Sequence, residues 1–96
     1  LPPAAGQSQI GIGLPRIAKK PTFGAYRAWR ATAERWARAV GCDMGELTPQ
    51  EVADLAPRLM SPELFQELLA LGKVESTWEG LLKTLRWKMG FHRDAI

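Results

Sequence analysis

Helix start signals at three places in the sequence constrain the fold most, because each one fixes where a short helix begins. TPQE (48–51) and SPEL (61–64) place a Thr or Ser directly before a Pro, and STWE (76–79) shares with TPQE a Glu at its fourth position. A Ser or Thr hydroxyl accepts a hydrogen bond from the first turn, a Pro there loses no hydrogen bond, and a Glu at the fourth position closes a capping box. Glycines suited to a left-handed helix end are Gly41, Gly72 and Gly90.

These signals predict an all-α fold, a small bundle of about four short helices. Thr22 is the expected cap of the first helix, and Pro57 is expected to bend or end the second because its ring clashes with the preceding turn. No segment shows the alternation of apolar and polar residues that is typical of a strand between turns. The expected helices cover about 22–40, the stretch from Thr48 to about Pro57, the stretch from Ser61 to Gly72, and about 77–89.

The first 21 residues have a different composition. They contain four prolines and three glycines, and no helical period runs through them. We therefore expect 1–21 to form an extended basic arm and 22–96 to form one compact helical domain with a single small core. The apolar residues expected to anchor the arm on a surface are Ile10, Ile12, Leu14 and Ile17.

The stretch FGAYRAWRATAERWARAVG (23–41) has the pattern of an amphipathic helix. At about 100° per residue, its rings and small apolar residues fall within an arc of about 140°, and most of its arginines lie outside that arc. We therefore expect the rings to belong to the core and the arginines to be recognition candidates. The residues of the apolar arc are Phe23, Tyr26, Trp29, Ala33, Trp36, Ala37 and Val40.

Charge is arranged in three blocks along the chain. Residues 1–40 carry seven Lys and Arg against one Glu, residues 41–82 carry eight acids against two bases, and residues 83–96 carry four bases against one acid. The net charges are therefore +6, −6 and +3. Such blocks indicate either polarised surfaces that face different neighbours or a basic first helix that lies against acidic middle helices.

Residues suited to catalysis or metal binding are scarce. The chain has one cysteine, Cys42, and one histidine, His92, whereas a metal site needs about three or four ligands and a nucleophile needs a nearby base. Phosphate-binding loops and nucleophile-elbow patterns are absent from the sequence. We therefore predict a protein that is not an enzyme, with no catalytic, cofactor-binding or metal-binding residue and no cofactor.

Trp87 differs from the other three tryptophans. The last expected helix gathers its leucines and Trp78 on one face, whereas Trp87 points the other way, beside Lys83 and Arg86. A tryptophan opposite the apolar face needs another surface to cover its ring. Either the arm or Phe91 covers it, or the ring contacts a partner.

A small nucleic-acid-binding domain is the alternative function. The arm and the first helix are basic, and Trp87 among cations would form a stacking surface. The stretch ELFQELLALGKVESTWEGLLKTLR also resembles a helix-turn-helix, with Gly72 as the turn glycine and 77–86 as the recognition helix. The sequence departs from that pattern at Leu68, where a small residue is usual, and at Glu79, which would meet phosphates.

The favoured function is that of a non-enzymatic accessory or structural subunit of a larger multi-protein assembly. An arm with apolar anchors, a minimal helical body and blocks of charge resemble in style the accessory subunits of organellar respiratory complexes, ATP synthases and ribosomes. The arm and the polarised helix faces would dock on protein subunits, and the basic ends would meet protein, RNA or an anionic lipid surface. A phage or secretion assembly factor is a third alternative. The expected partner-binding residues are Arg16, Lys19, Lys20, Arg27, Arg35, Arg38, Lys83, Arg86 and Trp87.

The compartment is expected to be intracellular, with the mitochondrion favoured. A single cysteine forms no internal disulfide, which favours a reducing compartment. The chain starts Leu-Pro-Pro rather than with Met, as expected of a mature, processed form or of a fragment of a longer chain. No apolar run approaches the length of about 18 residues that a membrane span needs, so no transmembrane segment is expected.

Overall fold

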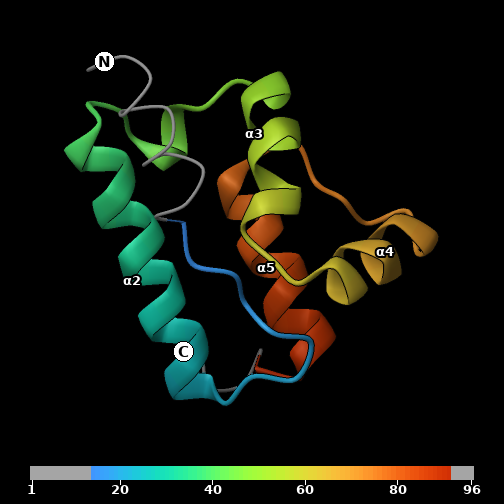
Figure 1. Ribbon diagram of the computed structural model, residues 1–96. Helices are drawn as coiled ribbons and strands as arrows, with labels where there is room; N and C mark the ends of the chain where they lie inside the picture. The colour runs from blue at the N-terminus through green and yellow to red at the C-terminus, as the bar shows by residue number, and fades with distance from the viewer. Residues whose placement is uncertain (1–13, 92–96) are drawn as a thin grey trace.

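Four α-helices make up most of the described chain, and a Ser or Thr side chain starts each of them. The computed structural model describes residues 14–91 (Figure 1). The predicted all-α fold is confirmed, because these described residues contain no strand beyond a bridge between two single residues. The helices are α2 (Phe23–Ala39), α3 (Pro49–Leu55), α4 (Pro62–Ala70) and α5 (Trp78–Met89).

Three of the four helix starts lie where the sequence predicts them. The Thr22 hydroxyl accepts a hydrogen bond of 3.0 Å from the first turn of α2, and the Ser61 hydroxyl accepts one of 3.3 Å from the first turn of α4. Thr48 and Glu51 form the complete capping box, with Thr48 Oγ1 accepting from Glu51 N at 3.2 Å and Glu51 Oε1 accepting from Thr48 N at 2.9 Å. Local side-chain chemistry therefore fixes these three starts.

The start of α5 lies one residue later than STWE predicts. Thr77, and not Ser76, is the cap, and its hydroxyl accepts a hydrogen bond from Gly80 N at 3.0 Å. Gly80 therefore occupies the third helical position, where Glu79 was expected to close a capping box. Since glycine has no carboxylate, α5 starts with a single hydroxyl cap.

Proline and glycine end the helices as predicted. α3 stops at Leu55, and a 3₁₀ turn over Ala56–Arg58 places Pro57 in its first turn, where the missing N–H costs nothing. A residue with left-handed φ follows each of the other three helices, and only glycine adopts this conformation without strain. These residues are Gly41 (φ 84°), Gly72 (φ 66°) and Gly90 (φ 76°).

The core forms around the apolar face of α2. Trp29 of α2 and Trp78 of α5 pack with ring centroids 5.6 Å apart. The predicted apolar arc of α2 is mostly buried, but Phe23 and Trp36 are only partly buried, and Val40, which follows the last helical residue, is 48% exposed. The largest fully buried side chains are Leu59, Met60, Leu64, Leu68, Leu81, Leu82 and Leu85.

Residues 14–21, the described part of the predicted arm and here called the strap, lie on the helical body. In Figure 1 the strap runs between α2 and the junction of α3 and α4. Ile17 N donates a hydrogen bond to Leu59 O at 3.0 Å, and Ile17 O accepts one of 2.9 Å from the residue that caps α4. Trp29 Nε1 donates to Leu59 O at 2.8 Å, so α2 and the strap meet at the same carbonyl.

Two of the four apolar anchors predicted in the arm are used within the chain. Leu14 and Ile17 are buried against the helical body as part of its core. Ile10 and Ile12 lie outside the described residues. The strap therefore contributes Leu14 and Ile17 to the core.

Candidate partner-binding surface

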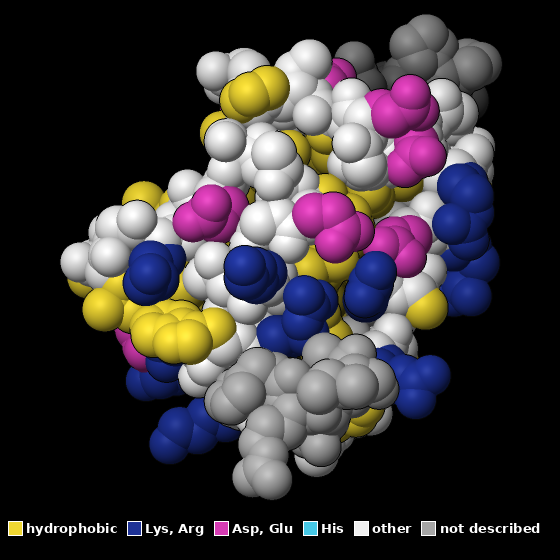
Figure 2. All heavy atoms as spheres, turned by 180° about the vertical axis from the view of Figure 1, so that it is seen from behind, with side chains coloured by type: hydrophobic (Ala, Val, Ile, Leu, Met, Phe, Trp, Pro, Cys, Tyr) yellow, Lys and Arg dark blue, Asp and Glu magenta, His cyan; other side chains and the backbone are white. Residues whose placement is uncertain are grey.

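Trp87 lies on the outer side of α5 and is 52% exposed. α5 buries Trp78, Leu81 and Leu85 on its inner side, and the helical repeat turns Trp87 away from that side. Figure 2 shows the kind of surface that results, with exposed hydrophobic side chains directly beside Lys and Arg. Trp87 is therefore the large aromatic side chain that the core leaves most accessible among the described residues.

Trp87 forms one wall of a shallow hollow of about 370 Å³. Lys73 Nζ lies 5.0 Å from the centroid of its ring, within the range of a cation–π contact. Lys83 lies one helical turn before Trp87 and lines the same hollow. We call this hollow and its rim the Trp87 surface. Its residues are Lys73, Glu75, Gly80, Lys83, Thr84 and Trp87.

Glu75 lies against the first turn of α5. A Cβ atom built on Gly80 would lie 3.2 Å from Glu75 Cβ and 3.3 Å from Glu75 Oε1, so the carboxylate approaches the helix because Gly80 has no side chain. A negative charge near a helix N-terminus is stabilised by the helix dipole. The ion pairs among residues 14–91 include neither Lys73 nor Lys83. Two lysine charges therefore flank the ring.

Neither of the two predicted covers lies over Trp87 in the described part of the chain. Phe91 packs on α2, with its ring centroid 5.3 Å from that of Phe23 and 5.7 Å from that of Tyr26. The strap is held at Leu59 and the start of α4. Lys73 is the one described side chain recorded over the ring, and it comes from the loop after α4.

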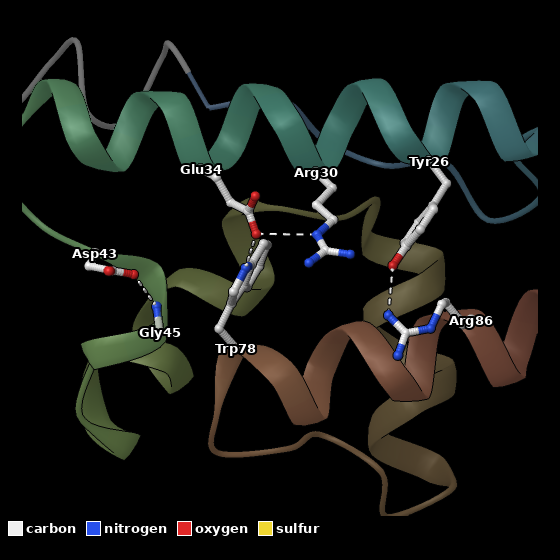
Figure 3. Close-up of polar contacts among 7 residues, drawn as sticks. All are labelled: Tyr26, Arg30, Glu34, Asp43, Gly45, Trp78 and Arg86. Carbon is white, nitrogen blue, oxygen red and sulfur yellow. Dashed lines mark hydrogen bonds and ion pairs between the residues drawn. The ribbon is translucent and has the colours of Figure 1, made fainter. Parts of the chain in front are cut away.

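The other predicted contact residue of α5, Arg86, is turned inward. α2 and α5 run antiparallel side by side, and Arg86 reaches across to Tyr26 (Figure 3). Arg86 Nη1 donates a hydrogen bond to the Tyr26 hydroxyl at 3.3 Å, and the side chain is partly buried. Arg86 therefore joins two helices, while Lys83 faces solvent.

Glu67 of α4 binds two lysines and holds the strap to the body. Lys19 Nζ lies 2.7 Å from Glu67 Oε2, and Lys88 Nζ lies 2.8 Å from Glu67 Oε1. Hydrogen bonds from Lys19 and Lys88 lower the pKa of Glu67 to about 2, and the Glu67 carboxylate raises the pKa of Lys19. Arg16 also binds the body, because its Nη1 donates to the carbonyl oxygens of Pro57 at 3.0 Å and Met60 at 3.1 Å.

Four of the predicted contact residues are exposed cations on α2 and the strap. Arg27, Arg35 and Arg38 lie on the outer face of α2, as the helical repeat predicts, and Lys20 is exposed at the end of the strap. The Arg27 guanidinium lies 5.9 Å from the centroid of the Phe23 ring. These four side chains are accessible to a partner, but none of them lines the Trp87 surface.

Acidic residues of the middle block lie beside the end of α2. Arg38 shares a hollow of about 150 Å³ with Glu34, Asp43 and Glu79. Together with the two ion pairs of Glu67, this arrangement brings the basic and acidic blocks into contact within the chain. The charge blocks are therefore partly internal.

Glu34 is occupied by the fold. Its Oε2 accepts a hydrogen bond from Trp78 Nε1 at 2.8 Å and lies 3.2 Å from Arg30 Nε (Figure 3). Asp43 caps the following turn by accepting from Gly45 N at 2.8 Å. No cluster of three His, Cys, Asp or Glu side chains suited to a metal ion occurs within residues 14–91. The polar groups drawn in Figure 3 therefore hold the structure together.

Cys42 is a partly buried thiol. Burial raises its pKa, and the charges of Glu51 and Asp43 raise it further. A raised pKa keeps the sulfur protonated and lowers its nucleophilicity at neutral pH. His92, the base that a Cys42–His92 pair would need, lies outside the described residues.

The connection between α4 and α5 differs from a helix-turn-helix turn. α4 ends at Ala70 and α5 begins at Trp78, so residues 71–77 separate them. The turn of a DNA-reading helix-turn-helix is about 3–4 residues long.

None of the helices among residues 14–91 is long and apolar enough to cross a membrane.

Lys73 is the residue of the Trp87 surface that the sequence pattern did not indicate. It follows Gly72 in the loop between the helices, and nothing in the local sequence shows that this loop turns back over Trp87.

The fold thus defines a small all-α protein whose most distinctive surface feature is an exposed tryptophan between two lysines. No protein-family model, curated protein or solved structure matches this chain.

Proposed function

We propose that this chain is a non-catalytic protein-binding subunit of a larger assembly and that it docks through the Trp87 surface. The observation that carries the proposal is the half-exposed Trp87 ring between Lys73 and Lys83. Tryptophan anchors with a polar rim are enriched in the energetic centres of protein interfaces. We propose an organellar assembly, and a mitochondrial one first, because the chain combines an N-terminal arm, a small helical body and blocks of charge.

The use of several other cations within the chain supports a protein partner. Arg16, Lys19 and Lys88 bind groups of the chain itself, and Arg38 lies beside acidic residues. A nucleic-acid backbone is usually bound along a continuous row of cations. The Trp87 surface offers two lysines and one carboxylate around one ring, which suits a local contact.

A nucleic-acid partner is the second candidate. The observation that favours it is the same ring, because an exposed tryptophan beside lysines also stacks on a base. The two candidates differ in their sensitivity to nuclease and to salt, since counterion release makes nucleic-acid affinity fall steeply with salt.

The size of the native protein in an extract of its source cells tests the proposal. We expect the wild-type chain to elute in a species much larger than its own 10.6 kDa. Trp87→Ala should shift it towards the monomer size. Val40→Ala is the matched control, because Val40 is exposed to a similar degree but does not line the Trp87 surface, and it should elute like wild type.

Two results would overturn the proposal. A wild-type chain that elutes as a lone monomer at its natural concentration is not part of a stable assembly. A large species that collapses on nuclease treatment, and depends on Trp87, assigns the surface to a nucleic acid instead.

A further inference from the structure

We infer that the Trp87 surface takes an acidic segment of the partner, with an apolar side chain placed against the ring and carboxylates placed against Lys73 and Lys83. This inference rests on the proposed function and adds the chemistry of the occupant. It follows from charge complementarity across the hollow.

The apolar part of the surface is the exposed half of the Trp87 ring. The Lys73 ammonium nitrogen lies 5.0 Å from the centroid of the ring, and the residue is exposed, so the charge remains accessible beside the ring. Lys83 stands one turn away on the same side of α5. A leucine or phenylalanine side chain would cover the exposed half of the ring and remove apolar area from water.

The charged part of the surface selects the sign of the occupant. Lys73 and Lys83 are exposed, and neither takes part in an ion pair among residues 14–91. The third charged group in the hollow, Glu75, lies against the first turn of α5, where the helix dipole stabilises its negative charge. Two carboxylates of a partner segment would therefore meet two lysines that have no counter-ion in the described structure.

The spacing of these groups favours a short peptide over a polyanion. The two lysines and the ring belong to one hollow, which also contains Glu75. A phosphodiester backbone that continued through the hollow would also meet the Glu75 carboxylate. An acidic peptide with one apolar residue engages the hollow and ends there.

Selection from a library of random 12-residue peptides displayed on phage tests the inference with the full chain as bait. Phage that also bind Trp87→Ala are removed, so only binders that need the ring remain. We expect the remaining peptides to be enriched in Asp and Glu and to share a Leu, Phe or Trp. Enrichment of basic or uncharged peptides, or no enrichment, overturns the inference.

Charge reversal at the rim gives the second arm of the test. A selected acidic peptide, labelled and measured by fluorescence polarisation, should bind Lys83→Glu at least about tenfold more weakly than wild type. Arg58→Glu is the matched control, because Arg58 is an exposed cation outside the hollow, and its affinity should equal that of wild type. The twin peptide with Lys in place of its acids should gain affinity for Lys83→Glu.

The outcomes separate this inference from the proposed function. If Gln and Asn twins of the peptide bind as tightly as the acidic form, the ring docks a partner without reading charge, and only the inference fails. If the wild-type chain binds a second copy of itself through Trp87 in sedimentation, the occupant is another copy and the inference fails. If an oligouridylate displaces the peptide and binds more tightly, both the inference and the proposed function fail.

Discussion

At the scale of single residues, distant partners decide which charged side chains are available for binding. In the sequence, Arg16, Lys83 and Arg86 are all predicted as exposed cations. In the fold, Arg16 donates hydrogen bonds to carbonyl oxygens more than forty residues away, and Arg86 donates one to Tyr26, sixty residues away. No local pattern carries that information, because the contacts arise only when the helices pack. The exposure of Arg27 and Trp87, by contrast, follows from the helical repeat alone.

The Trp78–Glu34 hydrogen bond is one contact whose removal should be measurable. Trp78→Phe keeps a ring in the core but removes the Nε1 donor that lies 2.8 Å from Glu34 Oε2. We expect it to lower the free energy of unfolding by about 2 kcal/mol, since a hydrogen bond to a charged group contributes roughly that much. Trp36→Phe, at a partly buried ring, is the control and should cost less in the same urea titration. Equal losses would show that ring volume matters and the hydrogen bond does not.

Glu67 should make the stability of the chain depend on pH in acid. Its pKa is about 2 in the folded chain against an ordinary value of 4.5, so the unfolded chain takes up the proton first as the pH falls. The stabilisation is therefore complete above about pH 4.5 and is lost progressively as the pH falls towards 2. Urea midpoints measured across this range should fall less steeply for Glu67→Gln than for wild type. The same slope in both proteins would contradict the assignment.

At the scale of the elements, the sequence predicts the helices well because their ends are chemical and local. Thr48 with Glu51 closes its capping box, and Pro57 ends α3, without help from the rest of the chain. The start of α5 was predicted one residue early, because Ser76 and Thr77 are both good caps. With Thr77 as the cap, Trp78 is the first helical residue and is buried beside Trp29. The packing of Trp78 therefore helps to decide which of the two residues caps α5.

The register of α5 gives a direct prediction. Thr77→Ala removes the hydroxyl that accepts from Gly80 N and should lower the free energy of unfolding by about 1 kcal/mol. Ser76→Ala, one residue earlier, should change it by less than about 0.5 kcal/mol. Thermal or urea unfolding of the two variants side by side decides between them. The reverse order of effects would mean that Ser76 is the cap after all.

At the scale of the whole molecule, the parts that escaped prediction are those formed by long-range packing. The sequence identifies apolar anchors in the strap. It does not show that Ile17 of the strap forms a backbone hydrogen bond with Leu59, which lies more than forty residues away. The Trp87 surface combines a residue of α5 with Lys73 from the preceding loop, and only the folded chain brings them together. The result is a helical body that uses some of its cations in internal contacts and leaves one tryptophan half exposed, with two lysines beside it.

We propose that Trp87 serves binding rather than folding, and urea unfolding of the isolated chain tests this most directly. Trp87→Ala should lower the free energy of unfolding by no more than about 1 kcal/mol, because the ring is half exposed and its contact with Lys73 is weak at such a site. Trp78→Ala, at a ring that is only 3% exposed, should cost about 3–5 kcal/mol in the same experiment. A loss for Trp87→Ala as large as that for Trp78→Ala would make Trp87 a structural residue and would contradict its assignment as the anchor of a binding surface.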